Sequence, residues 1–211
     1  MADTAWIIDA VRSPRGKGKE TGALHNVHPQ RILAQVLNAL RDRNGLDTSL
    51  VDDVVMGCGA GSGDHSMDIA RMAALDAGWS LDAPGVTLNR FCGSSMQAIH
   101  HAAGAIRMGA GEAFLCAGVE SMTRVPIMGF NPLPHPGLVQ SLPQAYVSMG
   151  ETAENVARQY GISRAEQDAF ALASQTKAAG AEAAGRFQDE RVPITTRTGV
   201  VAADGCIRPE T

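Results

Sequence analysis

The sequence lacks the cysteine patterns of a disulfide-stabilised or zinc-binding protein. It has four cysteines, Cys58, Cys92, Cys116 and Cys206, and no two of them lie close together along the chain. A disulfide framework or a structural zinc site needs cysteines at short, regular spacings. We therefore expect free thiols, no metal and a reducing compartment, which favours the cytoplasm.

Three other absences narrow the class of protein. The chain has 18 Lys and Arg against 22 Asp and Glu, so it lacks the basic excess that a nucleic-acid partner requires. No apolar run approaches membrane-spanning length, and no basic, apolar leader precedes Trp6–Ile8. The glycine-rich segment 57–63 has Ser62 where a GxGxxG motif needs its last glycine, and no GK[ST] occurs. We expect no membrane span and no nucleotide-binding loop.

The histidines do not predict a metal site either. His25 and His28 have a spacing that could suit a metal, but His28 precedes Pro29 at an expected helix start and no third ligand is near. A capping or surface role is favoured for both. His135 lies between two prolines and is expected in a loop.

The segment NRFCGSSMQAIH, residues 89–100, places a cysteine between an expected strand and an expected helix. Val86–Leu88 is short, apolar and β-branched, which indicates a buried strand. Apolar residues then recur at spacings of three and four, as in a helix: Met96, Ile99, Ala103 and Ile106. The small residues Ala98, Ala102, Gly104 and Ala105 would let this helix pack closely on a sheet. Cys92 would thus precede a helix N-terminus, where unpaired N–H groups and the helix dipole favour a thiolate nucleophile.

A buried structural cysteine is the alternative interpretation, because free cysteine often behaves as a small core hydrophobe. Cys92 precedes the helical stripe, however, and the small residues 93–95 follow it where a core position would need bulk. Spacing alone leaves the two interpretations about even. Cys58 and Cys116 adjoin or lie within apolar runs and are expected in strand interiors.

The first part of the chain alternates between strand and helix patterns. The expected strands are 6–10, 53–57, 86–88 and 113–117; the expected helices run from Pro29 to Gly45, up to Gly78, and onward from Cys92. Such alternation predicts an α/β fold with a parallel sheet covered by helices.

The pattern changes after Gly118. Residues 121–147 contain five of the ten prolines and little periodicity, so a long loop of the kind that carries function is expected. Capping boxes follow at Ser148–Glu151 and Ser163–Glu166, and each predicts a helix start. Glycines predict where these helices end: the first near Gly161 and the second near Gly180 or Gly185. Residues 192–201 should form a hairpin about Gly199.

Three long motifs resemble those of the thiolase family, in the same order. They are VTLNRFCGSSMQAIHHAAGAIRMG around Cys92, AGVESMTRVP at 117–126 and MGETAENVARQYGISRAEQDAFALASQ at 149–175. The likeness is closest to degradative 3-ketoacyl-CoA thiolases and covers essentially the whole chain. It implies the thiolase-like α/β fold, in which a parallel or mixed sheet covered by helices forms half of a five-layered αβαβα arrangement. An incomplete N-terminal domain would occupy 1–120, and an inserted, truncated loop domain 121–211.

The resemblance also implies an activity. Cys92 would carry the acyl group during thiolytic cleavage of a 3-ketoacyl-CoA to acetyl-CoA and a shortened acyl-CoA, or during the reverse Claisen condensation, as in fatty acid β-oxidation and lipid metabolism. Coenzyme A would be a substrate, and no cofactor is implied. Ser148 aligns with a position near the CoA tail where biosynthetic thiolases have a histidine, and Met149 with a residue beside the acyl pocket; both would bind substrate. For Ser148, the capping box alone is the competing explanation.

In the resembled family, the catalytic base, the second cysteine and the last strand of this sheet lie in a C-terminal part that the 211 residues do not include. The resemblance therefore implies that this chain alone is inactive and needs a C-terminal thiolase half. A homodimer or homotetramer is also implied. Two alternatives remain open: a non-catalytic CoA-binding or oligomer-forming thiolase-like subunit, and a condensing enzyme of the ketoacyl-synthase type.

Overall fold

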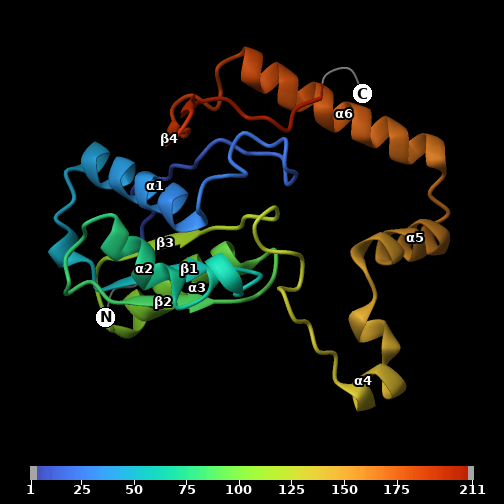
Figure 1. The fold of residues 1–211 in the computed structure, drawn as a ribbon, viewed down its shortest axis with the longest axis horizontal. Helices are drawn as coiled ribbons and strands as arrows, with labels where there is room; N and C mark the ends of the chain where they lie inside the picture. Colours follow the sequence, from blue (N-terminus) through green and yellow to red (C-terminus); the bar gives the residue numbers. More distant parts are fainter. Residues whose placement is uncertain (1–3, 209–211) are drawn as a thin grey trace. The chain divides into compact units, whose positions relative to one another are not determined.

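The computed structural model describes residues 4–208, which form two compact units (Figure 1). The first unit comprises the residues up to Phe130 together with Gln188–Cys206, and the second comprises Asn131–Phe187 with Ile207 and Arg208. The division into a domain at 1–120 and a loop domain at 121–211 stays a prediction about the whole protein.

The first unit is built on a three-stranded parallel sheet. Strand β1 (Asp53–Gly57) lies between β2 (Gly85–Leu88) and β3 (Phe114–Gly118). The predicted α/β pattern with a parallel sheet is confirmed, although β2 is a half-buried edge strand and not the fully buried strand that its β-branched residues suggested.

Helices cover both faces of this sheet. Helices α1 (Pro29–Asn44) and α2 (Ile69–Asp76) pack on the face that carries Val54, Met56 and Leu115, and together they form the buried core of the unit. The opposite face carries α3 (Ser94–Met108), whose first turn lies directly on the glycines that end β1 and β3. Two 3₁₀ turns, η1 (Thr48–Leu50) and η2 (Gly63–His65), lie in the connections.

Helix α1 begins and ends where the sequence predicts. The Nδ1 atom of His28 accepts a hydrogen bond from the N–H of Gln30 at 3.2 Å, and Pro29 occupies the first helical position. Gly45 terminates the helix with a left-handed φ of 58°. The capping role expected for His28 is confirmed.

The close packing of α3 that its small residues predict is confirmed. Ala98 and Ala102 are buried against the sheet, whereas Met96 is 65% and Ile99 42% exposed. Small side chains let the helix backbone approach the strands closely, so the larger apolar stripe points elsewhere.

The strand predicted at 6–10 is absent from the described residues. Trp6, Ile7 and Ile8 belong to no strand and are 79%, 74% and 83% exposed. An apolar run becomes a strand only when another strand pairs with it, and none does here: β3 pairs with β1 alone among the described strands. Nearby, the backbone of Arg12 forms an isolated β-bridge with Arg191, outside the named strands.

The end of the first unit is a hairpin tied back to the start of the chain. Strands β4 (Ile194–Thr196) and β5 (Gly199–Val201) pair antiparallel, as predicted. After it, the Asp204 carboxylate accepts hydrogen bonds from the Arg12 guanidinium at 2.8 Å and from the Arg15 N–H at 2.7 Å.

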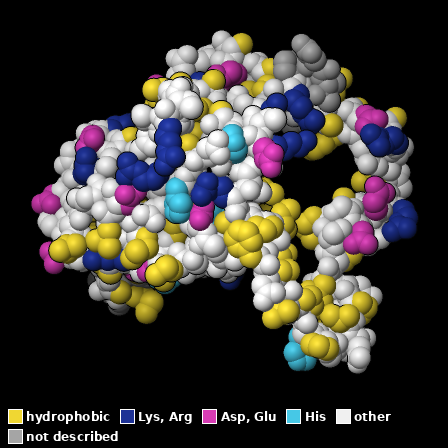
Figure 2. All heavy atoms as spheres, viewed as in Figure 1, with side chains coloured by type: hydrophobic (Ala, Val, Ile, Leu, Met, Phe, Trp, Pro, Cys, Tyr) yellow, Lys and Arg dark blue, Asp and Glu magenta, His cyan; other side chains and the backbone are white. Residues whose placement is uncertain are grey.

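The second unit is helical. It contains α4 (Pro136–Ser141), the 3₁₀ turn η3 (Pro143–Tyr146), α5 (Met149–Tyr160) and α6 (Arg164–Ala183). Both predicted capping boxes are present, whereas α4 and η3 were not expected in the proline-rich stretch. Figure 2 shows hydrophobic side chains gathered on the surface of α4, where Leu138 and Val139 are exposed. Across residues 4–208, no helix is both long and apolar enough to cross a membrane.

Candidate active site around Cys92

Three loops meet at the carboxyl end of the sheet in the first unit. Residues 58–60 follow β1, residues 89–92 follow β2, and residues 119–121 follow β3. Ligands of open parallel sheets bind at this end of the strands, because the connecting loops there leave a crevice. The predicted nucleophile Cys92 is the last residue of the segment that follows β2.

Cys92 lies on a tight turn between β2 and α3. Phe91 has a φ of +46°, a left-handed conformation that costs a bulky residue on the order of 1–3 kcal/mol. The Asn89 side chain stabilises the turn by accepting a hydrogen bond from the Phe91 N–H at 2.7 Å. The Ser94 hydroxyl stabilises it further, accepting from the Arg90 N–H at 2.8 Å and donating to the Phe91 carbonyl at 2.5 Å.

The turn presents both the thiol and the helix end to solvent. Cys92 is exposed, and Gly93 is the N-cap of α3 with no side-chain hydrogen bond to the first turn. Within residues 4–208, the Cys92 N–H donates to no acceptor, while the Gly93 and Ser94 N–H groups bond to Arg90 and Phe91. A free N–H and an uncapped helix N-terminus both favour negative charge beside the sulfur.

The other cysteines lie in different surroundings. Cys58 is buried directly after β1, and Cys116 lies within β3, where its thiol donates to the Ala98 carbonyl at 3.5 Å. Burial raises the pKa of the Cys116 thiol, which opposes thiolate formation. Cys206 is half-buried, with its thiol 3.6 Å from the Arg15 carbonyl. Cys92 is thus the accessible thiol of the four, and its catalytic role stays a prediction.

The two residues predicted to bind substrate belong to the second unit. Ser148 is the N-cap of α5; its hydroxyl accepts from the Glu151 N–H at 3.2 Å and its own N–H donates to the Glu151 carboxylate at 3.1 Å. Met149 follows it and is exposed. The capping explanation of Ser148 is confirmed, and substrate binding by Ser148 and Met149 stays a prediction.

Sequence reasoning missed a polar cluster at this end of the sheet. Glu120 follows β3, and its carboxylate accepts hydrogen bonds from the Gly59 N–H at 2.8 Å and the Ala60 N–H at 3.2 Å. The buried His65 places Nδ1 3.0 Å from the Ala60 carbonyl and 3.3 Å from Glu120 Oε1. Burial opposes ionisation of Glu120, but these hydrogen bonds hold its pKa below the usual value. Glu120 lies in the motif AGVESMTRVP, which was the available signal.

The geometry fixes the proton of His65. The Ser121 N–H lies 2.9 Å from Nε2, and a backbone N–H can only donate, so Nε2 is unprotonated and Nδ1 carries the proton. Burial also disfavours the charged ring, whereas Cys58 and Glu120 favour it and would raise the pKa of His65. The Ser121 N–H leaves no place for a second ring proton, and we assign the neutral ring.

The same geometry decides whether the cluster suits a metal. Among the described residues, Cys58, His65 and Glu120 bring potential ligand atoms within 4.8 Å of one another. A metal on Nδ1 would require the proton to move to Nε2, where it would meet the Ser121 N–H head-on. The cluster therefore suits a hydrogen-bonded network and not a metal ion.

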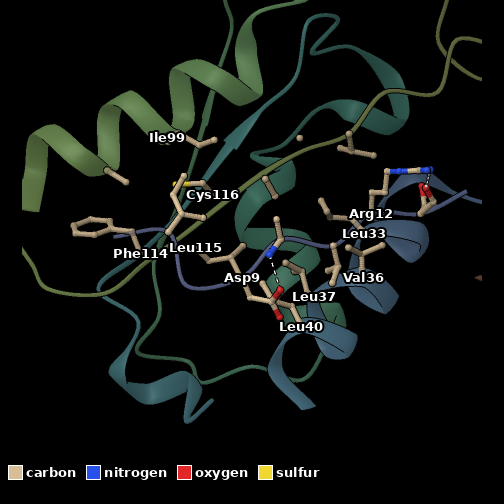
Figure 3. A pocket seen from close by; sticks show the side chains of 18 of the residues that line it. Asp9, Arg12, Leu33, Val36, Leu37, Leu40, Ile99, Phe114, Leu115 and Cys116 are labelled. Atoms are coloured by element: carbon tan, nitrogen blue, oxygen red, sulfur yellow. Dashed lines mark hydrogen bonds between the residues drawn. The ribbon is translucent and has the colours of Figure 1, made fainter. Parts of the chain in front are cut away.

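A large apolar groove of about 1610 Å³ runs along the free edge of β3 in the first unit, and its lining extends to Glu120 and Ser121 after the strand (Figure 3). Its lining comes from the unpaired segment around Ile7, from α1, from β3 and from the outer stripe of α3; it includes Leu33, Leu37, Ile99, Phe114 and Leu115. Cys92 is not part of this lining. The groove therefore offers an apolar packing surface beside the edge strand β3 and does not include the predicted nucleophile.

Comparison with known proteins decides the family. Residues 5–211 match the family described as "Thiolase, N-terminal domain". The chain is 42% identical to a 3-ketoacyl-CoA thiolase of Pseudoalteromonas translucida over 97% of its length, and 38% identical to one of Bacillus subtilis over 95%. The chain belongs to the thiolase family.

Solved structures agree on the thiolase fold. The dimeric peroxisomal thiolase of Saccharomyces cerevisiae superposes with a TM-score of 0.86 at 33% identity, and the acetyl-CoA acetyltransferase of Bacillus anthracis with 0.81 at 38% identity. Each comparison covers 97% of this chain but only 54% and 55% of the other. This thiolase chain spans about half the length of the relatives it matches, 54% and 51% for the two sequences named above.

Proposed function

We propose that the complete thiolase containing this chain cleaves 3-ketoacyl-CoA by thiolysis, with Cys92 as the nucleophile. The observation that carries the proposal is the exposed Cys92 thiol on a strained turn at an uncapped helix N-terminus. The two sequence relatives match 97% and 95% of this chain and are named 3-ketoacyl-CoA thiolases, which supports the substrate class.

In this proposal the Cys92 thiolate attacks the 3-keto carbon, and a carbon–sulfur bond forms. Collapse of the tetrahedral oxyanion then breaks the bond between C2 and C3 and releases the enolate of acetyl-CoA, which takes up a proton. The thiol of coenzyme A finally takes the acyl group from Cys92 and regenerates the free thiol. Coenzyme A is a substrate throughout, and the same steps in reverse give a Claisen condensation.

The free Cys92 N–H is suited to stabilise the oxyanion. A backbone donor aimed at such an oxygen contributes ~3–4 kcal/mol to transition-state stabilisation. Its neighbours Gly93 and Ser94 have N–H groups already bonded within the turn, so they are not available for this role.

The proton transfers need groups from outside this chain. His65 is buried at this end of the sheet, but both of its ring nitrogens are engaged, with Ser121 and with Ala60 and Glu120. We propose that a C-terminal thiolase half supplies the base and the acid. We propose further that the groove along β3 receives a strand of that half, because β3 is an edge strand among the described residues and the groove beside it is lined mostly by apolar side chains.

The remaining sequence predictions complete the proposal. Ser148 and Met149 contact the bound CoA thioester, and the assembled enzyme is a cytoplasmic homodimer or homotetramer that acts in fatty acid β-oxidation. The dimeric yeast thiolase supports an oligomer, and the four free cysteines support a reducing compartment.

The test traps the acyl-enzyme. The chain is combined with the C-terminal half of a related thiolase, supplied with a 3-ketoacyl-CoA in the absence of free CoA, and analysed by peptide mass mapping. Acyl mass on the Cys92 peptide is expected, and Cys92→Ser should abolish both the adduct and thiolysis. Acylation elsewhere would overturn the assignment, and CoA binding without any adduct would favour a non-catalytic subunit.

A further inference from the structure

Beyond the nucleophile itself, the carboxyl end of the sheet contains a series of hydrogen bonds that leads from Glu120 to Phe91, the residue before Cys92. It begins at Glu120, after β3, whose carboxylate binds the Gly59 and Ala60 N–H groups of the loop after β1. It continues from the Gly59 carbonyl, which accepts a hydrogen bond from the Asn89 side-chain amide at 3.0 Å. The side-chain oxygen of Asn89, Oδ1, then accepts a hydrogen bond from the N–H of Phe91, one residue before Cys92.

Each link restricts the next one. The Asn89 amide can hold Phe91 only in the orientation that its other end permits, and that end is fixed on Gly59. The peptide group that carries the Gly59 carbonyl also carries the Ala60 N–H, which donates to the Glu120 carboxylate, an acceptor stronger than a neutral group. Phe91 needs such support, because its left-handed φ of +46° is unfavourable without it.

His65 holds Glu120, the first residue in this series of hydrogen bonds. Its neutral ring receives the Ser121 N–H on Nε2 and directs the Nδ1 proton toward Ala60 and Glu120, so it joins the loops after β1 and β3. The titratable groups that face the Glu120 carboxylate among residues 4–208 are this ring and the Cys58 thiol, 3.9 Å away.

We propose that Glu120, supported by His65 and acting through Gly59 and Asn89, is a positioning residue for the Cys92 nucleophile. It does not touch the sulfur. It holds the turn in the conformation that places Cys92 just before the N-terminus of α3. The proposal rests on the proposed function, since it assumes that Cys92 is the nucleophile.

The test measures iodoacetamide labelling of each cysteine in the folded chain by peptide mass mapping, and uses the rate at Cys92 divided by the rate at Cys206 as an internal ratio. Glu120→Gln is isosteric but replaces one acceptor oxygen with an NH₂ group, which faces a backbone N–H. The ratio is expected to fall roughly fivefold or more. Glu112→Gln, an exposed glutamate just before β3, is the matched control and should leave the ratio unchanged.

Two further variants separate positioning from simple packing. Glu120→Asp keeps a carboxylate on a shorter stem, so it should retain more of the ratio than the isosteric Gln does; a packing role predicts the opposite order. Asn89→Asp keeps the acceptor for Phe91 but loses the donor to Gly59, and it should lower the ratio as well. The double variant should have about the same ratio as Glu120→Gln alone, because both changes break the same series of hydrogen bonds.

The outcomes distinguish this proposal from the one it rests on. If Cys92 is not the fastest-labelled cysteine in the unchanged chain, the nucleophile assignment fails. If it is the fastest and both Glu120→Gln and Asn89→Asp leave its ratio unchanged, the nucleophile assignment stands and the positioning role is wrong. Fully additive effects of the two variants would also overturn the shared chain of contacts.

Discussion

Gly57, the last residue of β1, lies directly against Ser94, the first residue of α3. A methyl group on Gly57 would be 2.3 Å from the Ser94 carbonyl carbon and 2.4 Å from the Ser95 nitrogen. Strand and helix therefore touch backbone to backbone, two residues from Cys92. This contact explains why α3 buries only small side chains near its start.

Gly57→Ala is expected to push the first turn of α3 off the sheet. Overpacking of this kind costs about 1–3 kcal/mol of unfolding free energy, and it should also slow alkylation of Cys92. Gly104→Ala, on the same helix with open space at its Cβ position, is the control and should be neutral or stabilising. Urea unfolding and labelling rates check both. Equal stability of the two variants would contradict the close contact.

Iodoacetamide near pH 7 should label Cys92 well before Cys58 and Cys116 in the folded chain. Cys58 is buried, and burial both shields the Cys116 thiol and raises its pKa. Denaturing the protein should abolish the difference in rate. Dominant labelling of Cys206 in the folded chain would argue against an activated thiol at Cys92.

The first unit should lose stability in acid through Asp204. Hydrogen bonding to Arg12 lowers the pKa of this carboxyl from 3.8 to about 2, against the opposing effect of burial. Its contribution, about 2 kcal/mol, is present above pH 4 and is lost as the pH falls through 2. Urea unfolding followed by tryptophan fluorescence at pH 5, 3 and 2 measures the slope. Asp204→Asn should lower stability at pH 5 and flatten this part of the slope.

Ser148→Ala and Ser163→Ala remove equivalent capping boxes from α5 and α6. Each should cost ~1 kcal/mol of helix stability, visible as a similar loss of helical circular dichroism on heating. In the assembled enzyme, only Ser148→Ala should raise the KM for CoA if Ser148 also contacts the substrate. Identical KM values for both variants would limit Ser148 to its capping role.

Ile99→Asp should prevent association with a C-terminal thiolase half. Ile99 lines the groove along β3, and a carboxylate there would be buried without a partner when a strand fills the groove. Met96→Asp, on the same helix outside the groove lining, is the matched control. Co-purification of tagged halves gives the readout. Unimpaired co-purification of Ile99→Asp would show that the groove is not the contact surface.

Local sequence signals were sufficient where the physics is local. The proline and glycine that bound α1 act within one or two residues, and so do the capping boxes at Ser148 and Ser163. The position of Cys92 before a helix follows from the same short-range pattern. These features were read correctly because each depends on a few adjacent residues.

Long-range pairing was not readable. The apolar run Trp6–Ile8 looks like a strand, but a strand forms only when a neighbour supplies hydrogen bonds, and none does among residues 4–208. The apolar stripe of α3 likewise does not reveal what it faces: Met96 and Ile99 are exposed, and the small residues Ala98 and Ala102 are the ones buried against the sheet.

The sequence by itself determined the family, the α/β alternation and the candidate nucleophile, because motifs, helix caps and periodicity are properties of neighbouring residues. Only the tertiary structure brought Glu120, His65 and Asn89 together near the turn that carries Cys92. These residues come after three different strands, so whether they meet depends on the order of the strands in the sheet. Strand order is set by the packing of the whole sheet against its helices, and no stretch of adjacent residues encodes it.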